Sequence, residues 1–203
     1  MTSLTPTSGA VAGGTVITVT GTGFLAMQTL TCSVGAVRQL ATYQTASLML
    51  CLTPTTGATG TVAVEASNNN NDFSSNGIGF LYRATESVTS VQPTIASVFG
   101  GTSVTVFGSE FVSTTSTQCR FGVTSVTATV QTSTRVLCVT PLHATSTVSV
   151  SVANNGIDFV TGVWFTYTDA PTVTSLLPVL GPVTGGTVVS VFGLNLLNVS
   201  RCA

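Results

Sequence analysis

The chain has 203 residues, of which only 11 are charged: five arginines, six acids and no lysine, for a net charge of -1. Nucleic-acid binding needs a basic stripe and a polybasic membrane-surface patch needs clustered cations, so both are excluded, as is lysine-based Schiff-base chemistry. Hydrophobic residues make up 43% of the chain, and 39 threonines and 22 serines supply uncharged polarity, which predicts a folded protein rather than a disordered one. No run of about 18 apolar residues free of Pro and Gly is present, so no membrane insertion is expected.

A unit of about 86 residues is repeated along the chain. The opening segment Thr2–Pro6 recurs at Thr89–Pro93 and Thr174–Pro178, with offsets of 87 and 85 residues, and a Gly-Gly-Thr triplet follows each copy. We therefore expect two complete domains, residues 1–86 and 87–171, and the opening strands of a third, incomplete one, residues 172–203. A hairpin-sized piece buries too little surface to fold alone, so the third is expected to continue beyond residue 203 or to dock on another chain.

Within each unit apolar residues alternate with polar ones, which is typical of half-buried strands. In chain order, strands are expected at residues 61–66, 79–83, 101–108, 146–153 and 163–168. Gly, Pro, Asn and Ser separate such segments, which predicts an all-β chain of tandem immunoglobulin-like β-sandwiches with about seven strands each and no helix longer than about three turns. The valines expected to be buried or nearly so are Val16, Val62, Val64, Val104, Val106, Val148 and Val150.

The order of these motifs resembles the IPT/TIG family of immunoglobulin-like domains. The resemblance is carried by the Ser-x-x-Pro opening, the Gly-Gly-Thr before an alternating strand, the Cys-x-(Val/Phe)-Gly at Cys32 and Cys119, the Cys-x-Thr-Pro at Cys51 and Cys138, and the aromatic closing strand. It covers essentially the whole chain and implies the sandwich fold. Such domains occur in plexin-type and scatter-factor-type receptors, bacterial surface proteins, starch-degrading enzymes and some transcription factors, so the family alone does not decide the function.

Four of the five cysteines form two pairs with the same spacing of 19 residues: Cys32 with Cys51, and Cys119 with Cys138. A metal site is the alternative, but one histidine and six scattered acids offer no second ligand cluster. We expect each pair to form a disulfide between neighbouring strands, which indicates an oxidising, extracellular compartment. Cys202 is expected to have no partner within this chain, and an intermolecular bridge is the alternative.

Few residues are candidates for catalysis. His143 is the only histidine and follows a proline in a predicted turn, so a loop histidine is expected rather than a member of a Ser-His-Asp triad. Asp72 and Asp158 are repeat-equivalent, and each follows an Asn-rich turn in which a carboxylate binds local backbone N–H groups, with a calcium ligand as the minor alternative. The Gly-rich turns precede strands, not a helix, and are not phosphate loops. We expect no enzyme activity, no metal and no cofactor.

Three features of the predicted surface are candidates for glycan chemistry. The run Ser113–Thr117 is a candidate for O-glycans, and Asn198 begins the sequon Asn-Val-Ser and is a candidate for N-glycosylation. Trp164 with its neighbours Phe165 and Tyr167 is a candidate sugar-stacking platform, although alternation places at least one face of this segment in the core.

These observations favour a structural repeat subunit of an extracellular filament or cell-surface appendage, whose partners are further copies of itself or other surface proteins. The modules share one plan, the nearly uncharged surface gives weak repulsion between subunits, and edge strands lack the lysines that keep ordinary sandwiches apart. Two alternatives remain. One is a ligand-binding or stalk segment of a receptor or adhesin, and the other is an accessory carbohydrate-binding segment of a secreted enzyme.

Overall fold

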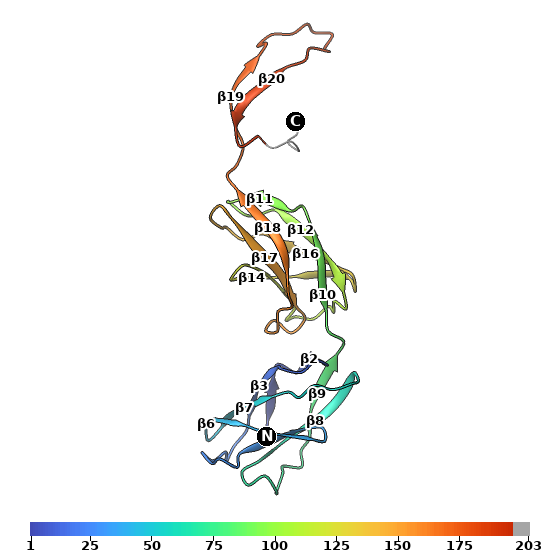
Figure 1. The fold of residues 1–203 in the computed structure, drawn as a ribbon, viewed down its shortest axis with the longest axis vertical. Coiled ribbons are helices and arrows are strands. Elements are labelled where there is room, and N and C mark those ends of the chain that lie inside the picture. Colours follow the sequence, from blue (N-terminus) through green and yellow to red (C-terminus); the bar gives the residue numbers. More distant parts are fainter. Residues whose placement is uncertain (197–203) are drawn as a thin grey trace.

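The computed structural model describes residues 1–196, which form two β-sandwich modules placed end to end and a two-stranded hairpin beyond them (Figure 1). The expected all-β, tandem immunoglobulin-like fold is therefore confirmed. Within residues 1–196 no helix is long and apolar enough to cross a membrane. Asn198 and Cys202, for which glycosylation and pairing were considered, lie outside the described residues.

Module 1 is a sandwich of a four-stranded and a five-stranded sheet. Its strands are β1 (Ser3–Thr5), β2 (Ser8–Ala10), β3 (Val16–Thr20), β4 (Thr31–Val34), β5 (Val37–Leu40), β6 (Thr42–Thr45), β7 (Leu48–Leu52), β8 (Gly60–Ser67) and β9 (Ile78–Arg83). The sheet orders are β1-β3-β7-β6 and β2-β9-β8-β4-β5. The β2–β9 pair is parallel, and the other pairs are antiparallel.

Module 2 repeats this plan. Its strands are β10 (Ser87–Gln92), β11 (Ile95–Ser97), β12 (Ser103–Ser109), β13 (Gln118–Phe121), β14 (Thr124–Thr127), β15 (Thr129–Thr132), β16 (Arg135–Val139), β17 (Ser146–Ala153) and β18 (Val163–Thr168). The sheet orders are β10-β12-β16-β15 and β11-β18-β17-β13-β14, again with one parallel pair, β11–β18. The two modules therefore match strand for strand.

Each module has nine strands rather than about seven, because two long strands are divided between the sheets. The first strand breaks at Pro6 or Pro93, which has no amide hydrogen for a sheet ladder, and its two parts pair with different sheets. Both prolines follow cis peptide bonds. The segments β5–β6 and β14–β15 change sheets in the same way.

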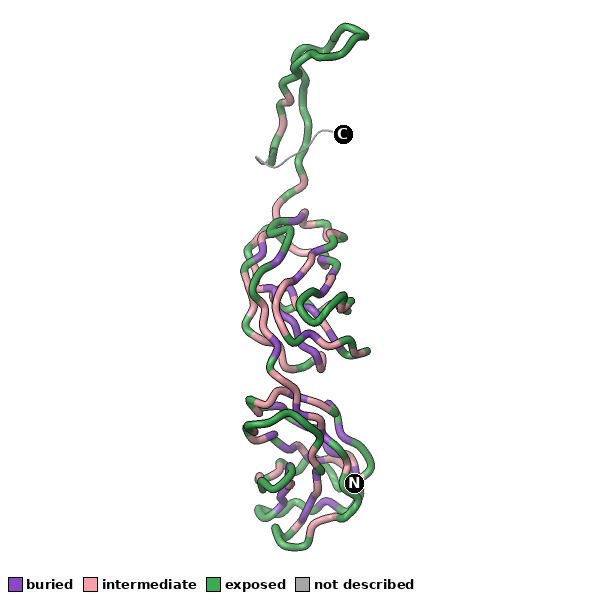
Figure 2. Tube along the Cα trace, turned by 90° about the vertical axis from the view of Figure 1, so that its right-hand side faces the viewer, coloured by how far each residue is buried: buried purple, intermediate pink, exposed green. Residues whose placement is uncertain are grey.

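Each module has its own apolar core, seen as buried stretches inside both modules in Figure 2. In module 2, Phe121, Phe165 and Tyr167 meet edge to face, with ring centroids 5.2 to 6.4 Å apart. Such aromatic contacts contribute beyond the area that they bury. The core of module 1 contains Ile17 from β3 and Phe80 from β9, one residue from each of its two sheets.

The predicted burial of the valines is confirmed except at one residue. Val64, Val104, Val106 and Val150 are fully buried, and Val62 and Val148 pack against the cores while partly exposed. Val16 is 46% exposed, so this prediction was wrong. Alternation along β3 turns Ile17 and Val19 inward, and therefore turns Val16 toward solvent.

A disulfide crosses the core of each module. Cys32 on β4 is joined to Cys51 on β7, and Cys119 on β13 is joined to Cys138 on β16, with Cα–Cα distances of 6.3 Å in both. The strands of each pair belong to opposite sheets. The expectation of a bridge between neighbouring strands was therefore wrong, and each disulfide connects the two layers of its sandwich.

The hairpin β19 (Thr172–Leu177) and β20 (Ser190–Leu194) corresponds to β10 and β12 of module 2. It has the same antiparallel pairing, the same cis peptide bond before Pro178, and the same pair of left-handed glycines in its connection. Its residues are mostly exposed (Figure 2).

Candidate functional site

The joint between modules 1 and 2 brings together motifs from both repeats and is the candidate functional site. Three segments form it: the Gly-Gly-Thr turn of module 1 (residues 8–15), the link between β9 and β10 (residues 84–86), and the connection between β17 and β18, which we call Asn loop 2 (residues 154–159). The equivalent connection of module 1, residues 68–73, is called Asn loop 1.

Asn loop 2 is shaped by hydrogen bonds of Asn155. Its side-chain oxygen accepts the backbone N–H groups of Ile157 at 3.1 Å and Asp158 at 2.9 Å. Its side-chain nitrogen donates to Asp158 Oδ2 at 2.7 Å. The expected turn is present, but the expectation that the carboxylate binds its backbone N–H groups was wrong, because the Asn155 amide oxygen binds them and Asp158 accepts from side chains instead. The result is a carboxylate held in one orientation.

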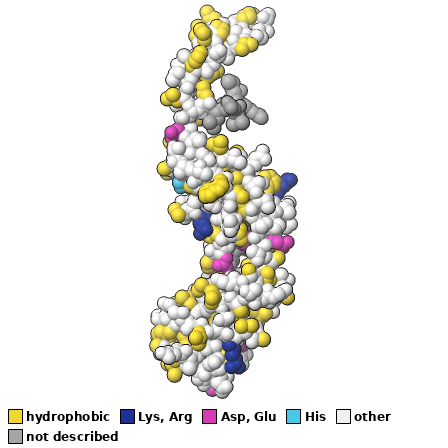
Figure 3. Space-filling view, in the orientation of Figure 1, with side chains coloured by type: hydrophobic (Ala, Val, Ile, Leu, Met, Phe, Trp, Pro, Cys, Tyr) yellow, Lys and Arg dark blue, Asp and Glu magenta, His cyan; other side chains and the backbone are white. Residues whose placement is uncertain are grey.

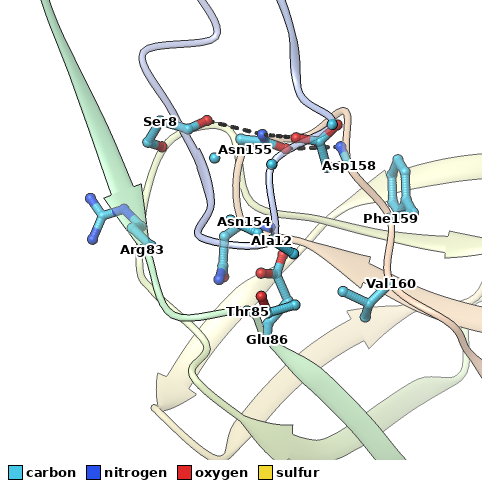
Figure 4. A pocket seen from close by; sticks show the side chains of 14 residues that line it. Ser8, Ala12, Arg83, Thr85, Glu86, Asn154, Asn155, Asp158, Phe159 and Val160 are labelled. Carbon is cyan, nitrogen blue, oxygen red and sulfur yellow. Dashed lines mark hydrogen bonds between the residues drawn. The ribbon is translucent and has the colours of Figure 1, made fainter. Parts of the chain in front are cut away.

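The same two side chains also contact module 1. Thr15 Oγ1 donates to Asp158 Oδ2 at 2.6 Å. Asn155 Nδ2 donates to the backbone oxygen of Ser8 at 3.0 Å (Figure 4). Thr15 is only 1% exposed, although it lies at the end of its module. Because hydrogen bonds to an ionised acceptor are stronger than neutral ones, the contact between Thr15 and Asp158 is the main polar contact across the joint.

Asn154 connects Asn loop 2 to the rest of module 2 and to the link. Its side chain donates to Glu110 O at 2.8 Å and accepts from Val112 N at 2.9 Å, and its backbone N–H donates to Glu86 Oε1 at 2.9 Å. Asn154 is buried. The link is thereby attached to the base of the loop that module 1 touches.

Glu86 is a buried carboxylate in the middle of the joint, with 8% of its surface exposed. Burial raises the pKa of the Glu86 carboxyl above its usual value, and the negative charge of Asp158 adds to the rise, while the Asn154 backbone N–H opposes it. The joint therefore contains a titratable group whose charged form is disfavoured.

Among the cavities at the joint, two of about 300 and 320 Å³ are both lined by Arg83, Asn154 and Asn155. The first also contains Glu86 and Asp158 (Figure 4). In residues 1–196 no group of three or more His, Cys, Asp or Glu side chains is placed to hold a metal ion. Hydrogen bonds connect the two modules at the joint.

The other predicted site residues lie apart from the joint. The His143 ring stacks on Tyr167, with centroids 4.8 Å apart, and its Nδ1 lies 2.8 Å from Ala144 O and 3.2 Å from Ser146 Oγ. It is a loop histidine with local partners, as expected. Trp164 is 72% exposed, whereas its neighbours Phe165 and Tyr167 are buried, so any stacking platform consists of Trp164 without them.

The run Ser113–Thr117 is only partly available as a glycan-bearing surface. Thr117 is 1% exposed, and its hydroxyl donates to Val112 O at 2.7 Å, so its assignment as a solvent-facing hydroxyl was wrong. The Thr114 hydroxyl donates to Asn154 O at 2.9 Å. These two side chains support Asn loop 2, and Ser113, Thr115 and Ser116 are the exposed members of the run.

The sequence predicts a turn at Asn155 and Asp158, but it does not predict their role between modules. The signal was present, because Asn69 and Asp72 of module 1 occupy the equivalent positions and Gly-Gly-Thr triplets occur in all three repeats. The sequence does not show that the Gly-Gly-Thr turn of one module contacts the Asn loop of the next module.

Comparisons with known proteins agree with the fold. The plexin A4 extracellular region, domains 1 to 10, is similar with a TM-score of 0.55 and 19% identity, over 88% of this chain and 18% of that chain. SGBP-B of the Bacteroides ovatus mixed-linkage glucan utilization locus (TM-score 0.33, 14% identity, 81% and 43% coverage) and the bacterial integrin-binding protein invasin (0.32, 14%, 86% and 41%) are more distant in structure.

These similarities are of fold alone, and the chain spans less than a fifth of the plexin A4 chain. A comparison with curated proteins finds no match. The model of the IPT/TIG domain family, however, matches residues 1–82 and again residues 87–167, each match lying in one of the two sandwiches. The chain belongs to the IPT/TIG domain family.

Proposed function

We propose that the chain is a structural, non-catalytic repeat subunit of an extracellular filament or cell-surface appendage, in which IPT/TIG modules are held end to end. The observation that carries this proposal is the joint. The Thr15 hydroxyl donates to Asp158 Oδ2 at 2.6 Å, and the Asn155 side chain donates to the Ser8 carbonyl oxygen. A link of three residues and these contacts act together to limit bending between modules.

The burial of Glu86 supports the same function. Domains joined by a flexible linker move freely by default, and their linkers are exposed. Here the link contributes a buried side chain that is hydrogen-bonded to module 2. A joint of this kind suits a protein that forms a straight, extended assembly rather than one that closes around a ligand.

An extracellular location is supported by the two disulfides, which persist in oxidising compartments. The surface supports assembly, because charged side chains are few and widely separated on the face seen in Figure 3. Weak electrostatic repulsion allows neighbouring subunits to approach closely.

Negative-stain imaging and light scattering of the native protein test this function. We expect rods whose length increases with protein concentration. In the Asp158→Ala variant we expect bent particles, because the carboxylate acceptor of Thr15 is lost, while Asp169→Ala, which removes an exposed acid elsewhere, leaves the particles straight. Short, discrete particles at every concentration would favour the receptor or adhesin stalk instead.

Glycan binding is a second candidate, supported by the exposure of Trp164 on the outer face of β18. An exposed aromatic ring is a suitable surface for stacking a sugar ring. Trp164 is the only tryptophan of the chain, so its fluorescence reports on this surface alone. A titration with soluble oligosaccharides that leaves the emission unchanged excludes this role.

A further inference from the structure

Asn loop 1 has the same internal geometry as Asn loop 2. Asn69 Oδ1 accepts the backbone N–H groups of Asn71 at 3.0 Å and Asp72 at 2.8 Å, and Asn69 Nδ2 donates to Asp72 Oδ2 at 2.8 Å. At its base, Asn68 bonds Gly23 O and Leu25 N as Asn154 bonds the equivalent atoms of module 2. The difference is that Asn69 and Asp72 are exposed, whereas Asn155 and Asp158 are partly covered by module 1.

The other half of the joint also recurs, in the connection between β19 and β20. Gly185 and Gly186 have φ of 75° and 84°, compared with 72° and 83° for Gly13 and Gly14. Gly185 N donates to Pro182 O at 3.0 Å, as Gly13 N donates to Ala10 O at 2.9 Å. Thr187 follows these glycines as Thr15 follows the first pair, and it is exposed.

One glycine distinguishes this turn from the turn of module 2. In module 1 a side chain at Gly9 would clash with the Thr15 hydroxyl, and at the equivalent Gly181 a Cβ would lie 2.7 Å from Thr187 Oγ1. Both glycines leave room for the hydroxyl in this position. Module 2 has Ala96 here, so the Thr102 hydroxyl is excluded from the equivalent place.

We propose that Asn loop 1 of one chain binds the Gly-Gly-Thr turn of the β19–β20 hairpin of a second copy, with Thr187 donating to Asp72 and Asn69 donating to the backbone oxygen of Leu180. This inference rests on the proposed structural function and names its partner surface. Asn loop 1, between β8 and β9, and the β19–β20 connection lie at opposite ends of the elongated molecule (Figure 1). The contact therefore joins copies head to tail and does not close on itself.

The contact between copies is expected to be weaker than the joint within the chain. In the chain the link holds both halves together at a high effective concentration, which two separate copies lack. The test must therefore trap a weak contact without altering the atoms that make it.

Crosslinking at positions beside the contact meets this need. Thr7 and Ile157 are exposed and line the same cavity at the joint, and their repeat equivalents are Val179 and Asn71. In a Cys202→Ser background, Asn71→Cys copies are mixed with Val179→Cys copies and treated with a short bis-maleimide. We expect a crosslinked dimer. With Thr94→Cys copies, which present the turn containing Ala96, we expect about ten-fold less, the difference of one charge-assisted hydrogen bond.

Further variants identify the contact itself. Adding Asp72→Ala to the Asn71→Cys copy should lower the dimer yield about ten-fold, whereas adding Asp169→Ala should not. Equal yields from Thr94→Cys, or a yield unaffected by Asp72→Ala, would overturn the proposal.

The tethered pair Thr7→Cys with Ile157→Cys separates this proposal from the proposed function. If this pair crosslinks within one chain and the mixed copies do not, the joint stands but Asn loop 1 has a different occupant, and the second-copy proposal fails. If the tethered pair itself does not crosslink, the joint is wrong, and the proposed function fails with it.

Discussion

Two repeat-equivalent tyrosines, Tyr82 and Tyr167, are the penultimate residues of β9 and β18 but differ in what their hydroxyl groups contact. Tyr82 donates to Pro54 O at 2.8 Å, whereas the Tyr167 hydroxyl is buried without a hydrogen-bond partner among the described residues. Burial raises the pKa of Tyr167 to about 12. The His143 ring stacks on Tyr167, and module 1 has a threonine in the corresponding turn.

We expect phenylalanine substitutions at these tyrosines to have unequal effects. Tyr82→Phe removes a hydrogen bond and leaves the Pro54 carbonyl without this donor, so it should lower the free energy of unfolding by about 1 kcal/mol. Tyr167→Phe removes an unpartnered buried hydroxyl and should leave the free energy of unfolding unchanged or raise it. Denaturant unfolding measures both, and an equal loss in the two variants contradicts the assignment.

At the scale of strands and sheets, each module has one disulfide that links side chains of its two layers within the described residues. Replacing both Cys119 and Cys138 by alanine should lower the stability of module 2 by about 3 kcal/mol, because a loop of about 20 residues is no longer closed in the unfolded chain. Scanning calorimetry should show the transition of one module moving to lower temperature. The matched variant with Cys32→Ala and Cys51→Ala should move the other transition, and a variant that moves both equally argues against independent modules.

Local periodicity explains which elements could be predicted from the sequence. The strand predicted at 146–153 is β17 and that at 163–168 is β18, because alternation over six or eight residues is a strong local signal. At Val16 the local signal was ambiguous, since Ile17 and Val19 offer the opposite face. The placement of the disulfides across the sandwich could not be predicted, because which strands share a sheet depends on contacts distant in sequence.

At the scale of the whole molecule, the buried Glu86 makes the joint sensitive to pH. The unfolded chain loses this proton near pH 4.5, and the folded chain loses it at a higher pH. Between these two values the folded state binds more protons, so the contribution of Glu86 to stability falls as the pH rises and is lowest above the folded pKa. Below pH 4.5 both states are protonated, and the group makes no such difference.

Glu86→Gln should remove this dependence, because an amide keeps the acceptor for Asn154 N without the charge. The stability of the variant relative to the native protein should therefore increase from pH 4 to pH 7, as measured by denaturant unfolding at each pH. A relative stability that is constant over this range shows that Glu86 does not titrate differently in the folded state. Asp169→Asn, at an exposed acid, is the control.

In both modules an arginine stacks on the phenylalanine that ends the Asn loop. Arg38 lies over Phe73 at 4.9 Å, and Arg120 lies over Phe159 at 4.1 Å. These arginines are on different strands of the repeat: Arg38 faces Ser33 across β5 and β4, and Arg120 faces Ser125 across β13 and β14. When the two repeats are aligned, each arginine corresponds to a serine in the other module. In the structure, however, an arginine lies over the equivalent phenylalanine ring in both modules.

Asn loop 1 lies at one end of the molecule and the Gly-Gly-Thr turn of the β19–β20 hairpin lies at the other, so the two ends of the molecule differ chemically. Any polymer that uses this pair of surfaces has two chemically distinct tips, one displaying an Asn-Asp acceptor and the other a threonine donor. Elongation at the two tips then depends on different surfaces and can proceed at different rates. A protein carrying only one of the two surfaces would bind one tip and stop growth there, so the length of the polymer could be set by its supply.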